Sequence, residues 1–197
     1  KALADHSRVN LRVLTEAEQV VDTEGRKALK SVTLNTGEKI VCDTLAVSGG
    51  WSPNVHLTSH HRSKPVWNDT IQAFVPGTSL PAGQIPAGAA KGSFDLGQCL
   101  ADGQDAAQAA AEALGKSATS ATLPIPAAET TKAKAIWTVS GGKGRAWVDL
   151  QNDVTTKDVK LAHQEGFRSV EHLKRYTTLG MATDQGKTYN VLGLAIM

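Results

Sequence analysis

A segment poor in large apolar side chains divides this 197-residue chain and limits how it can fold. Residues 116–134 consist mainly of Ala, Thr, Ser, Pro and Lys, and they include Leu123-Pro124-Ile125-Pro126. Such a segment buries little apolar area, and each proline restricts the residue before it to extended conformations. The sequence therefore predicts a tether between two domains, residues 1–115 and residues 135–197.

Composition and charge exclude several classes of protein. The formal net charge is +2 and 20% of the residues are charged, without the basic stripe that nucleic-acid binding needs. No apolar run approaches the roughly 18–20 residues of a membrane span. We therefore expect neither a nucleic acid nor a membrane as partner. Cys42 and Cys99 are expected to be reduced and buried, as is typical of a cytoplasmic protein. The start at Lys1 instead of Met indicates a fragment of a longer polypeptide.

The first domain begins with a pattern typical of β-structure. Alternating apolar and polar residues predict a strand at 9–14, and turn residues separate three further predicted strands, at 18–22, 28–35 and 38–42. These three form an antiparallel meander. Residues 43–54 then predict a buried strand that ends in the turn at Gly49-Gly50, where the missing side chains let a ligand approach the backbone. An ordinary strand exit explains the same residues equally well.

Small residues precede the longest predicted helix. Residues 83–94 are rich in Gly and Ala, and the helix is predicted from Asp95 to Leu114 with Gly115 as its C′ residue. Small side chains ahead of a helix N-terminus leave room for a pyrophosphate and offer backbone N–H donors. The alternative is simple packing of helix on sheet through small side chains.

The second domain is predicted to be mainly helical. Residues 136–139 and 145–148 read as strands on either side of a glycine turn. Thr155-Thr156-Lys157-Asp158 fits a capping box, and the helix that it opens is predicted to end at Gly166. Ser169 is the predicted cap of a second helix stopped at Gly180, and residues 188–195 predict a third.

Two loops of this domain have the spacing of iron–sulfur ligand loops but contain no cysteine. Residues 146–155 have the frame of a Cys-x-Cys loop, with Asp149 and Gln151 at the cysteine positions. Residues 180–189 have the frame of a Cys-Gln-Gly-x-x-Cys loop, with Asp184 and Tyr189 there. A [2Fe–2S] cluster needs four thiolates, or two histidines in place of two of them. We therefore expect no metal here, and a domain this small to depend on packing against neighbours.

The cysteine-free sequence segments of this domain resemble one family. Asp-Leu-Gln-Asn-Asp-Val-Thr at 149–155, Glu-Gly-Phe-Arg-Ser-Val-Glu-His at 165–172 and the run at 174–188 are similar to the alpha subunit of heterotetrameric sarcosine oxidase. The resemblance implies an α/β fold (an α+β mix). A partial domain like those of two-dinucleotide-binding flavoproteins is followed by a small helical domain that resembles a BFD-like ferredoxin without its cluster. A folate-binding domain is expected further along the polypeptide.

The resemblance also implies two cofactor contacts and no catalytic residue in this chain. In FAD-binding relatives the string before the long helix reads Ala-Gly-Asp, and here Ala89 stands at the acidic position, which favours NAD over FAD. The implied NAD contacts are Gly88, Ala89, Ala90, Phe94 and Leu96. The implied contacts to an FMN between the alpha and beta subunits are Thr183, Gln185, Gly186, Lys187 and Thr188. For this second set, a role in bracing the fold or the subunit contact is the alternative.

The implied activity is the oxidative demethylation of sarcosine to glycine. Its other products are hydrogen peroxide and either formaldehyde or, with tetrahydrofolate, 5,10-methylenetetrahydrofolate. Sarcosine is handled by the beta subunit, which carries FAD, and the gamma and delta subunits complete the cytoplasmic complex. Two alternatives stay open: a subunit of a related flavoenzyme that oxidises opines, proline or glycine, and a structural adaptor that binds no nucleotide.

Overall fold

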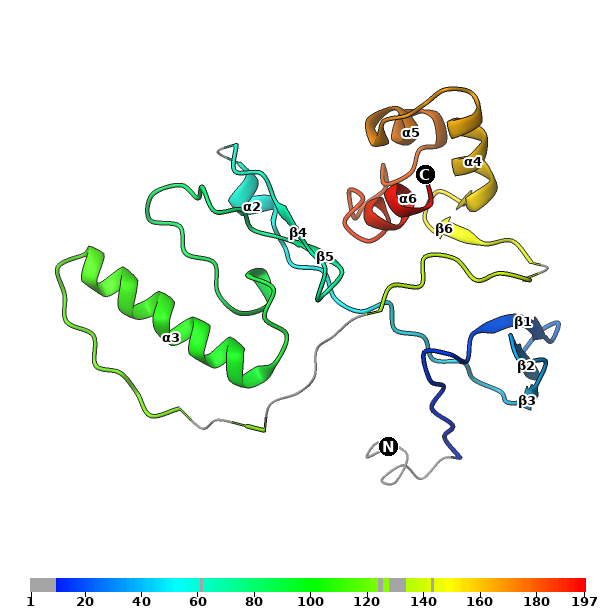
Figure 1. Ribbon diagram of the computed structural model, residues 1–197, viewed down its shortest axis with the longest axis horizontal. Coiled ribbons are helices and arrows are strands. Elements are labelled where there is room, and N and C mark those ends of the chain that lie inside the picture. Colours follow the sequence, from blue (N-terminus) through cyan, green and yellow to red (C-terminus); the bar gives the residue numbers. More distant parts are fainter. Residues whose placement is uncertain (1–9, 61, 124–125, 128–133, 143) are drawn as a thin grey trace. The chain divides into compact units, whose positions relative to one another are not determined.

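A computed structural model of the protein describes residues 10–60, 62–123, 126–127, 134–142 and 144–197. The fold is mixed α/β, and the chain divides into two compact units (Figure 1). Unit 1 combines Lys1–Val47 with Ile136–Met197, and unit 2 is Ser48–Ala135. The predicted domains, with boundaries at residues 115 and 134, are continuous stretches of sequence, and these boundaries stay a prediction.

The β-meander predicted near the start of the chain is confirmed. Its strands, hydrogen-bonded in the order β1-β2-β3, are β1 (Val20–Glu24), β2 (Ser31–Leu34) and β3 (Lys39–Val41). Both pairings are antiparallel. Val32 and Leu34 of the central strand are buried, and a Cβ added to Gly25 would overlap the carbonyl oxygen of Ala28. The turn between β1 and β2 therefore requires glycine.

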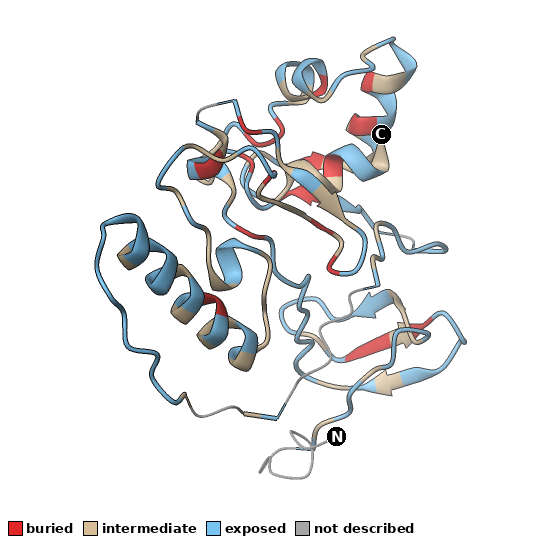
Figure 2. Cartoon of the chain, turned by 60° about the vertical axis from the view of Figure 1, so that its left-hand side comes forward, coloured by how far each residue is buried: buried red, intermediate tan, exposed pale blue. Residues whose placement is uncertain are grey.

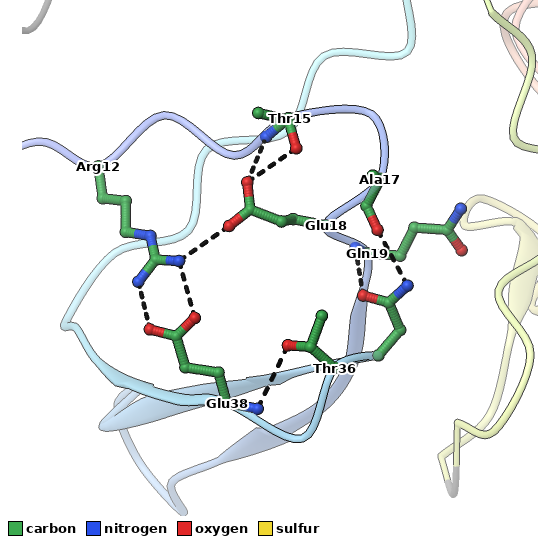
Figure 3. A network of polar contacts seen from close by, with 8 residues as sticks. Arg12, Thr15, Ala17, Glu18, Gln19, Thr36 and Glu38 are labelled. Atoms are coloured by element: carbon green, nitrogen blue, oxygen red, sulfur yellow. Dashed lines mark hydrogen bonds and ion pairs between the residues drawn. The ribbon is translucent and has the colours of Figure 1, made fainter.

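An exposed ionic network ties the segment before β1 to the turn between β2 and β3 (Figure 3). The Arg12 guanidinium donates to both carboxylate oxygens of Glu38, at 2.5 and 2.9 Å, and to Glu18 at 2.8 Å. The Thr15 N–H and hydroxyl also donate to Glu18. The Thr15 N–H and then Arg12 lower the pKa of Glu18 to about 2. Ionic hydrogen bonds from Arg12 therefore hold this segment, whereas the sequence predicted a β-strand at residues 9–14.

The carboxyl-terminal part of unit 1 packs helices around a small apolar core. Its elements are β6 (Trp147–Asp149), β7 (Val154–Thr155), α4 (Thr156–Gln164), α5 (Val170–Thr177) and α6 (Asn190–Ile196). The fully buried apolar residues of this core are Val148, Val154, Val159, Ala162, Leu173 and Leu179. The predicted capping box at Thr155 and Asp158 is confirmed, and the Ser169 hydroxyl accepts from the N–H of His172 at the start of α5.

Unit 2 contains a hairpin and the longest helix. Its elements are α2 (His56–Ser59), β4 (Val66–Asn68), β5 (Ala73–Val75), the 3₁₀ turn η1 (Gly88–Ala90) and α3 (Leu96–Ala113). Asp95 caps α3 by accepting from the N–H of Gln98 at 3.0 Å. At the other end the N–H groups of Gly115 and Lys116 donate back to Glu112 and Ala111. These two bonds form a Schellman motif, so the predicted Gly115 stop is confirmed.

Three predicted strands are wrong. Residues 10–14, 43–54 and 136–139 form no strand in the described part of the chain, and residue 9 lies outside it. Val47 and Trp51, predicted to be in or next to a buried strand, are 82% and 77% exposed. Alternation and apolarity indicate strand propensity, but a strand forms only beside a partner that completes its hydrogen bonds. Cys42 and Cys99 are free as predicted, but half-buried instead of buried.

Among the described residues, no helix has both the length and the apolarity that crossing a membrane requires. The longest, α3, is rich in alanine and most of its surface is exposed or half-buried (Figure 2).

Candidate functional site

The segment predicted to contact NAD is a tight turn held against the start of α3. The Gly88 carbonyl accepts from the N–H groups of Lys91, Gly92 and Ser93, at 2.9, 3.2 and 3.1 Å. A Cβ built on Gly88 would lie 3.6 Å from the Cys99 side chain, so this residue rests on the first turns of α3. The turn is thus closed on itself and docked on the helix.

Gly92 anchors the same turn on the hairpin of unit 2. Its φ is +108°, and an added Cβ would lie 2.8 Å from Val75 and 3.2 Å from Ile71. Both the backbone conformation and the close approach exclude a larger residue. Ile71 is itself buried. The course of the chain from Gly88 to Leu96 is therefore determined at three points: the turn, the hairpin and the helix.

The five residues predicted to contact NAD lie along this one segment. Ala89, Ala90 and Leu96 are exposed, whereas Gly88 and Phe94 are half-buried. The exposed alanines belong to η1, and residues 91–95 separate them from the 18-residue helix α3, whose N-terminus carries a partial positive charge. Small exposed side chains at this position leave space for a dinucleotide, and no acidic side chain occupies residues 88–94.

An ionic cluster around the buried Asp102 lies next to this segment, and the sequence alone did not predict it. Asp102, 3% exposed, accepts from the Lys91 ammonium at 2.8 Å, the Ser93 hydroxyl at 2.5 Å and the Gln98 amide at 3.3 Å. Burial alone raises the pKa of a carboxyl group, but these donors outweigh it, so the pKa of Asp102 lies below its ordinary value. A signal was available, because Asp95, Gln98 and Asp102 recur at helical spacing on one face.

The second candidate site is the loop between α5 and α6. Thr183, Gln185, Lys187 and Thr188 are exposed, and Gly186 is buried. The Asp184 carboxylate accepts from the N–H groups of Gly186 and Thr188, at 3.3 and 3.0 Å. The Lys187 N–H donates to the Asp184 carbonyl at 3.2 Å.

This arrangement corrects one expectation about the loop. The backbone N–H groups of residues 186–188, which belong to the implied FMN contacts, donate to Asp184. The helix itself begins at Asn190, later than expected. The exposed Lys187 ammonium is therefore the group of this loop best suited to a phosphate.

Two glycines shape the loop around one side chain. Gly180 and Gly186 have φ angles of 68° and 79°, and a Cβ added to either would overlap the side chain of Asn190. The loop therefore closes over the first residue of α6. Sequence reasoning named Gly186 as a ligand contact, and the structure shows that it is also a packing requirement.

Asp149, predicted to stand at the first cysteine position of a ligand-loop frame, links residues 146–155 to residues 180–189. It is fully buried and accepts from the N–H groups of Gln151 and Asn152 at 2.8 and 3.1 Å. Its other oxygen accepts from the N–H of Gly180 at 2.9 Å, 31 residues along the chain. Of the other three positions, Asp184 also accepts backbone N–H groups, Tyr189 packs on the core and Gln151 is exposed.

Comparison with known proteins identifies relatives of the whole chain. The family model described as "Sarcosine oxidase A3 domain" matches residues 143–197. The chain is 39% identical to sarcosine oxidase subunit alpha of Rhizobium meliloti (strain 1021), over 96% of this chain and 20% of that protein. It is 37% identical to sarcosine oxidase subunit alpha of Corynebacterium sp. (strain P-1), over 100% of this chain and 22% of that protein. The chain thus spans about a fifth of the length of these relatives.

A solved structure supports the fold. The crystal structure of L-proline dehydrogenase from P. horikoshii matches 88% of this chain and 38% of its own, with a TM-score of 0.58. The sequences are 18% identical, so the likeness concerns the fold alone.

Proposed function

This chain belongs to the family of sarcosine oxidase alpha subunits, and from that premise we propose that it is part of a complex that oxidatively demethylates sarcosine. The products are glycine, hydrogen peroxide and formaldehyde, or 5,10-methylenetetrahydrofolate when tetrahydrofolate is present. The observation that carries the proposal is the 39% identity to a sarcosine oxidase alpha subunit over 96% of this chain.

Within the complex, we propose that residues 1–115 complete a dinucleotide-binding domain and hold NAD. The candidate contacts are Gly88, Ala89, Ala90, Phe94 and Leu96. The exposed Ala89 and Ala90 of η1 support this role, because their small side chains leave room for a pyrophosphate and present no negative charge to it. Bound NAD supplies a nicotinamide ring capable of hydride transfer. The chain's own part is to bind the dinucleotide and to hold it in place.

The domain at 135–197 is proposed to be a cluster-free, ferredoxin-like scaffold at a subunit boundary, connected by the tether at 116–134. Asp149 and Asp184 support this interpretation, since the carboxylate of each accepts hydrogen bonds from backbone N–H groups. In this proposal the loop that contains Thr183, Gln185, Gly186, Lys187 and Thr188 contributes the alpha side of the interface where FMN lies between the alpha and beta subunits. Lys187 supplies the positive charge. Sarcosine is oxidised at an FAD of the beta subunit, and no residue of this chain is assigned a catalytic role.

The NAD proposal is tested on the complete complex. Denaturing the purified complex is expected to release one NAD per alpha subunit. Ala89→Asp places a carboxylate beside the pyrophosphate and is expected to lower the affinity for NAD on the order of tenfold. Ala82→Asp, on the exposed loop before the segment, is the matched control and is expected to retain NAD. A wild-type complex that oxidises sarcosine but releases no NAD would favour the structural adaptor.

The FMN interface is tested separately. Lys187→Ala is expected to lower the FMN content of the complex, because the neutral side chain no longer attracts the phosphate. Lys160→Ala, at an exposed position of α4, controls for the loss of a surface charge in the same domain. Equal FMN contents in the two variants would indicate that this loop only braces the fold or the subunit contact.

A further inference from the structure

Asp102 is an unusual residue to find buried. It is the one buried residue of α3, in a helix whose other positions are exposed or half-buried (Figure 2). A carboxylate removed from water is costly unless a cation or several donors compensate it. An alanine would bury the same helix face without that cost, so the carboxylate calls for a role beyond packing.

Its contacts run mostly to one short segment. Lys91 and Ser93, which donate to different oxygens of Asp102, directly follow the turn η1. The Cys99 thiol donates to the Ser93 carbonyl at 3.0 Å, one turn earlier on the same helix. Asp102 and Cys99 thereby clasp residues 91–93 onto α3 from two successive turns. The N–H groups of these residues in turn close on Gly88.

The clasp also arranges charge beside the exposed alanines. The Lys91 side chain is 53% exposed even though its ammonium contacts Asp102. The Lys91 ammonium neutralises the Asp102 carboxylate, which would otherwise repel an anion bound nearby. The ion pair also holds the ammonium group of this half-exposed side chain at the residue that follows Ala90.

We propose that Asp102 is a positioning residue for the dinucleotide segment: by holding Lys91 and Ser93 on α3 it sets the course of Gly88–Ala90, where the pyrophosphate of NAD binds. This inference rests on the proposed NAD site and adds to it the residue that organises it. Asp102 itself does not touch the ligand.

The test uses the complete complex and two independent readouts. Asp102→Asn keeps the size of the side chain but loses the charge that holds Lys91. Hydrogen exchange at the amides of residues 91–93 is expected to speed up about tenfold, and the dissociation constant for NAD to rise by a similar factor. Asp105→Asn, one turn along α3 and exposed, is the matched control and is expected to change neither.

A second pair of variants separates positioning from folding. Lys91→Met removes the cation but keeps an unbranched side chain, while Ser93 and Gln98 still donate to Asp102. This variant is expected to weaken NAD binding. Lys91→Arg restores the ion pair and is expected to recover most of the affinity. If the cluster contributed only to packing, Lys91→Arg would not bind NAD more tightly than Lys91→Met.

The outcomes distinguish this inference from the function on which it rests. Unchanged exchange in Asp102→Asn, or faster exchange with unchanged NAD affinity, overturns the positioning role. A wild-type complex that binds no NAD refutes the proposed site itself, whatever the exchange data show for Asp102.

Discussion

The carboxyl-terminal domain and helix α3 are held in place by opposite means. In the domain, α4 and α5 bury Val159, Ala162 and Leu173 completely, in a core shared with Leu179. In α3, an 18-residue helix, the buried residue is the carboxylate of Asp102. The first arrangement draws its stability from apolar area removed from water. The second is positioned by polar contacts at one end, so the same kind of substitution should act differently in the two regions.

The largest effect is expected in the apolar core. Leu173→Ala should lower the free energy of unfolding of the domain by about 2–5 kcal/mol, because the side chain is 0% exposed and leaves a cavity. Urea unfolding, followed by the fluorescence of Trp147 in a background in which the other three tryptophans are replaced by phenylalanine, measures the loss. Leu114→Ala at the exposed end of α3 is the matched control and should change stability by less than about 0.5 kcal/mol. Similar losses for the two leucines would contradict the comparison.

The polar bond between the ligand-like loops comes next. Asp149→Asn should cost about 1–3 kcal/mol, since an amide NH₂ cannot accept from the N–H groups that the carboxylate now satisfies. The control is Asp153→Asn, because Asp153 is exposed and its φ of 56° suits asparagine. Thermal unfolding of both variants gives the difference. If Asp149→Asn proves as stable as its control, the two loops are held by packing alone.

One substitution should have opposite signs in the two regions. Gly186→Ala is expected to destabilise by about 1–2 kcal/mol or more, because its φ of 79° is left-handed and Asn190 occupies the space. Gly103→Ala in α3 meets nothing within 4 Å and should stabilise the helix by up to about 1 kcal/mol. Circular dichroism during heating compares the two variants. A stabilised Gly186→Ala variant would show that the loop opens freely.

Acid should weaken the carboxyl-terminal domain gradually. The Thr155 hydroxyl and N–H lower the pKa of Asp158, and the Thr188 N–H lowers that of Asp184. Since unfolded aspartates titrate near about pH 3.9, the folded domain binds fewer protons there, and stability present above that pH is lost as the pH falls further. Urea titrations between neutral and acid pH measure this slope. Replacing both residues by asparagine should flatten it, and an unchanged slope would point to other carboxylates.

Local signals in the sequence were reliable where the chemistry is local. Asp95, Ser169 and the Thr155–Asp158 box begin their helices as predicted, and Gly115 ends one, because a cap involves residues only a few positions apart. The meander was predictable for the same reason, since short turns pair neighbouring strands. Residues 43–54 were not, because apolarity does not show whether a partner strand is present.

The candidate sites show the same division. The sequence by itself identified the Gly- and Ala-rich segment at 83–94. It also showed that the residues at the four predicted ligand positions, Asp149, Gln151, Asp184 and Tyr189, carry no thiolate, since both observations follow from residue identity and spacing. Only the tertiary structure decided that Asp102 reaches back to Lys91 and Ser93, and that Asp149 reaches Gly180. The physical reason is that the environment of a buried carboxylate depends on which distant donors the fold brings within hydrogen-bonding distance, and no local pattern encodes that.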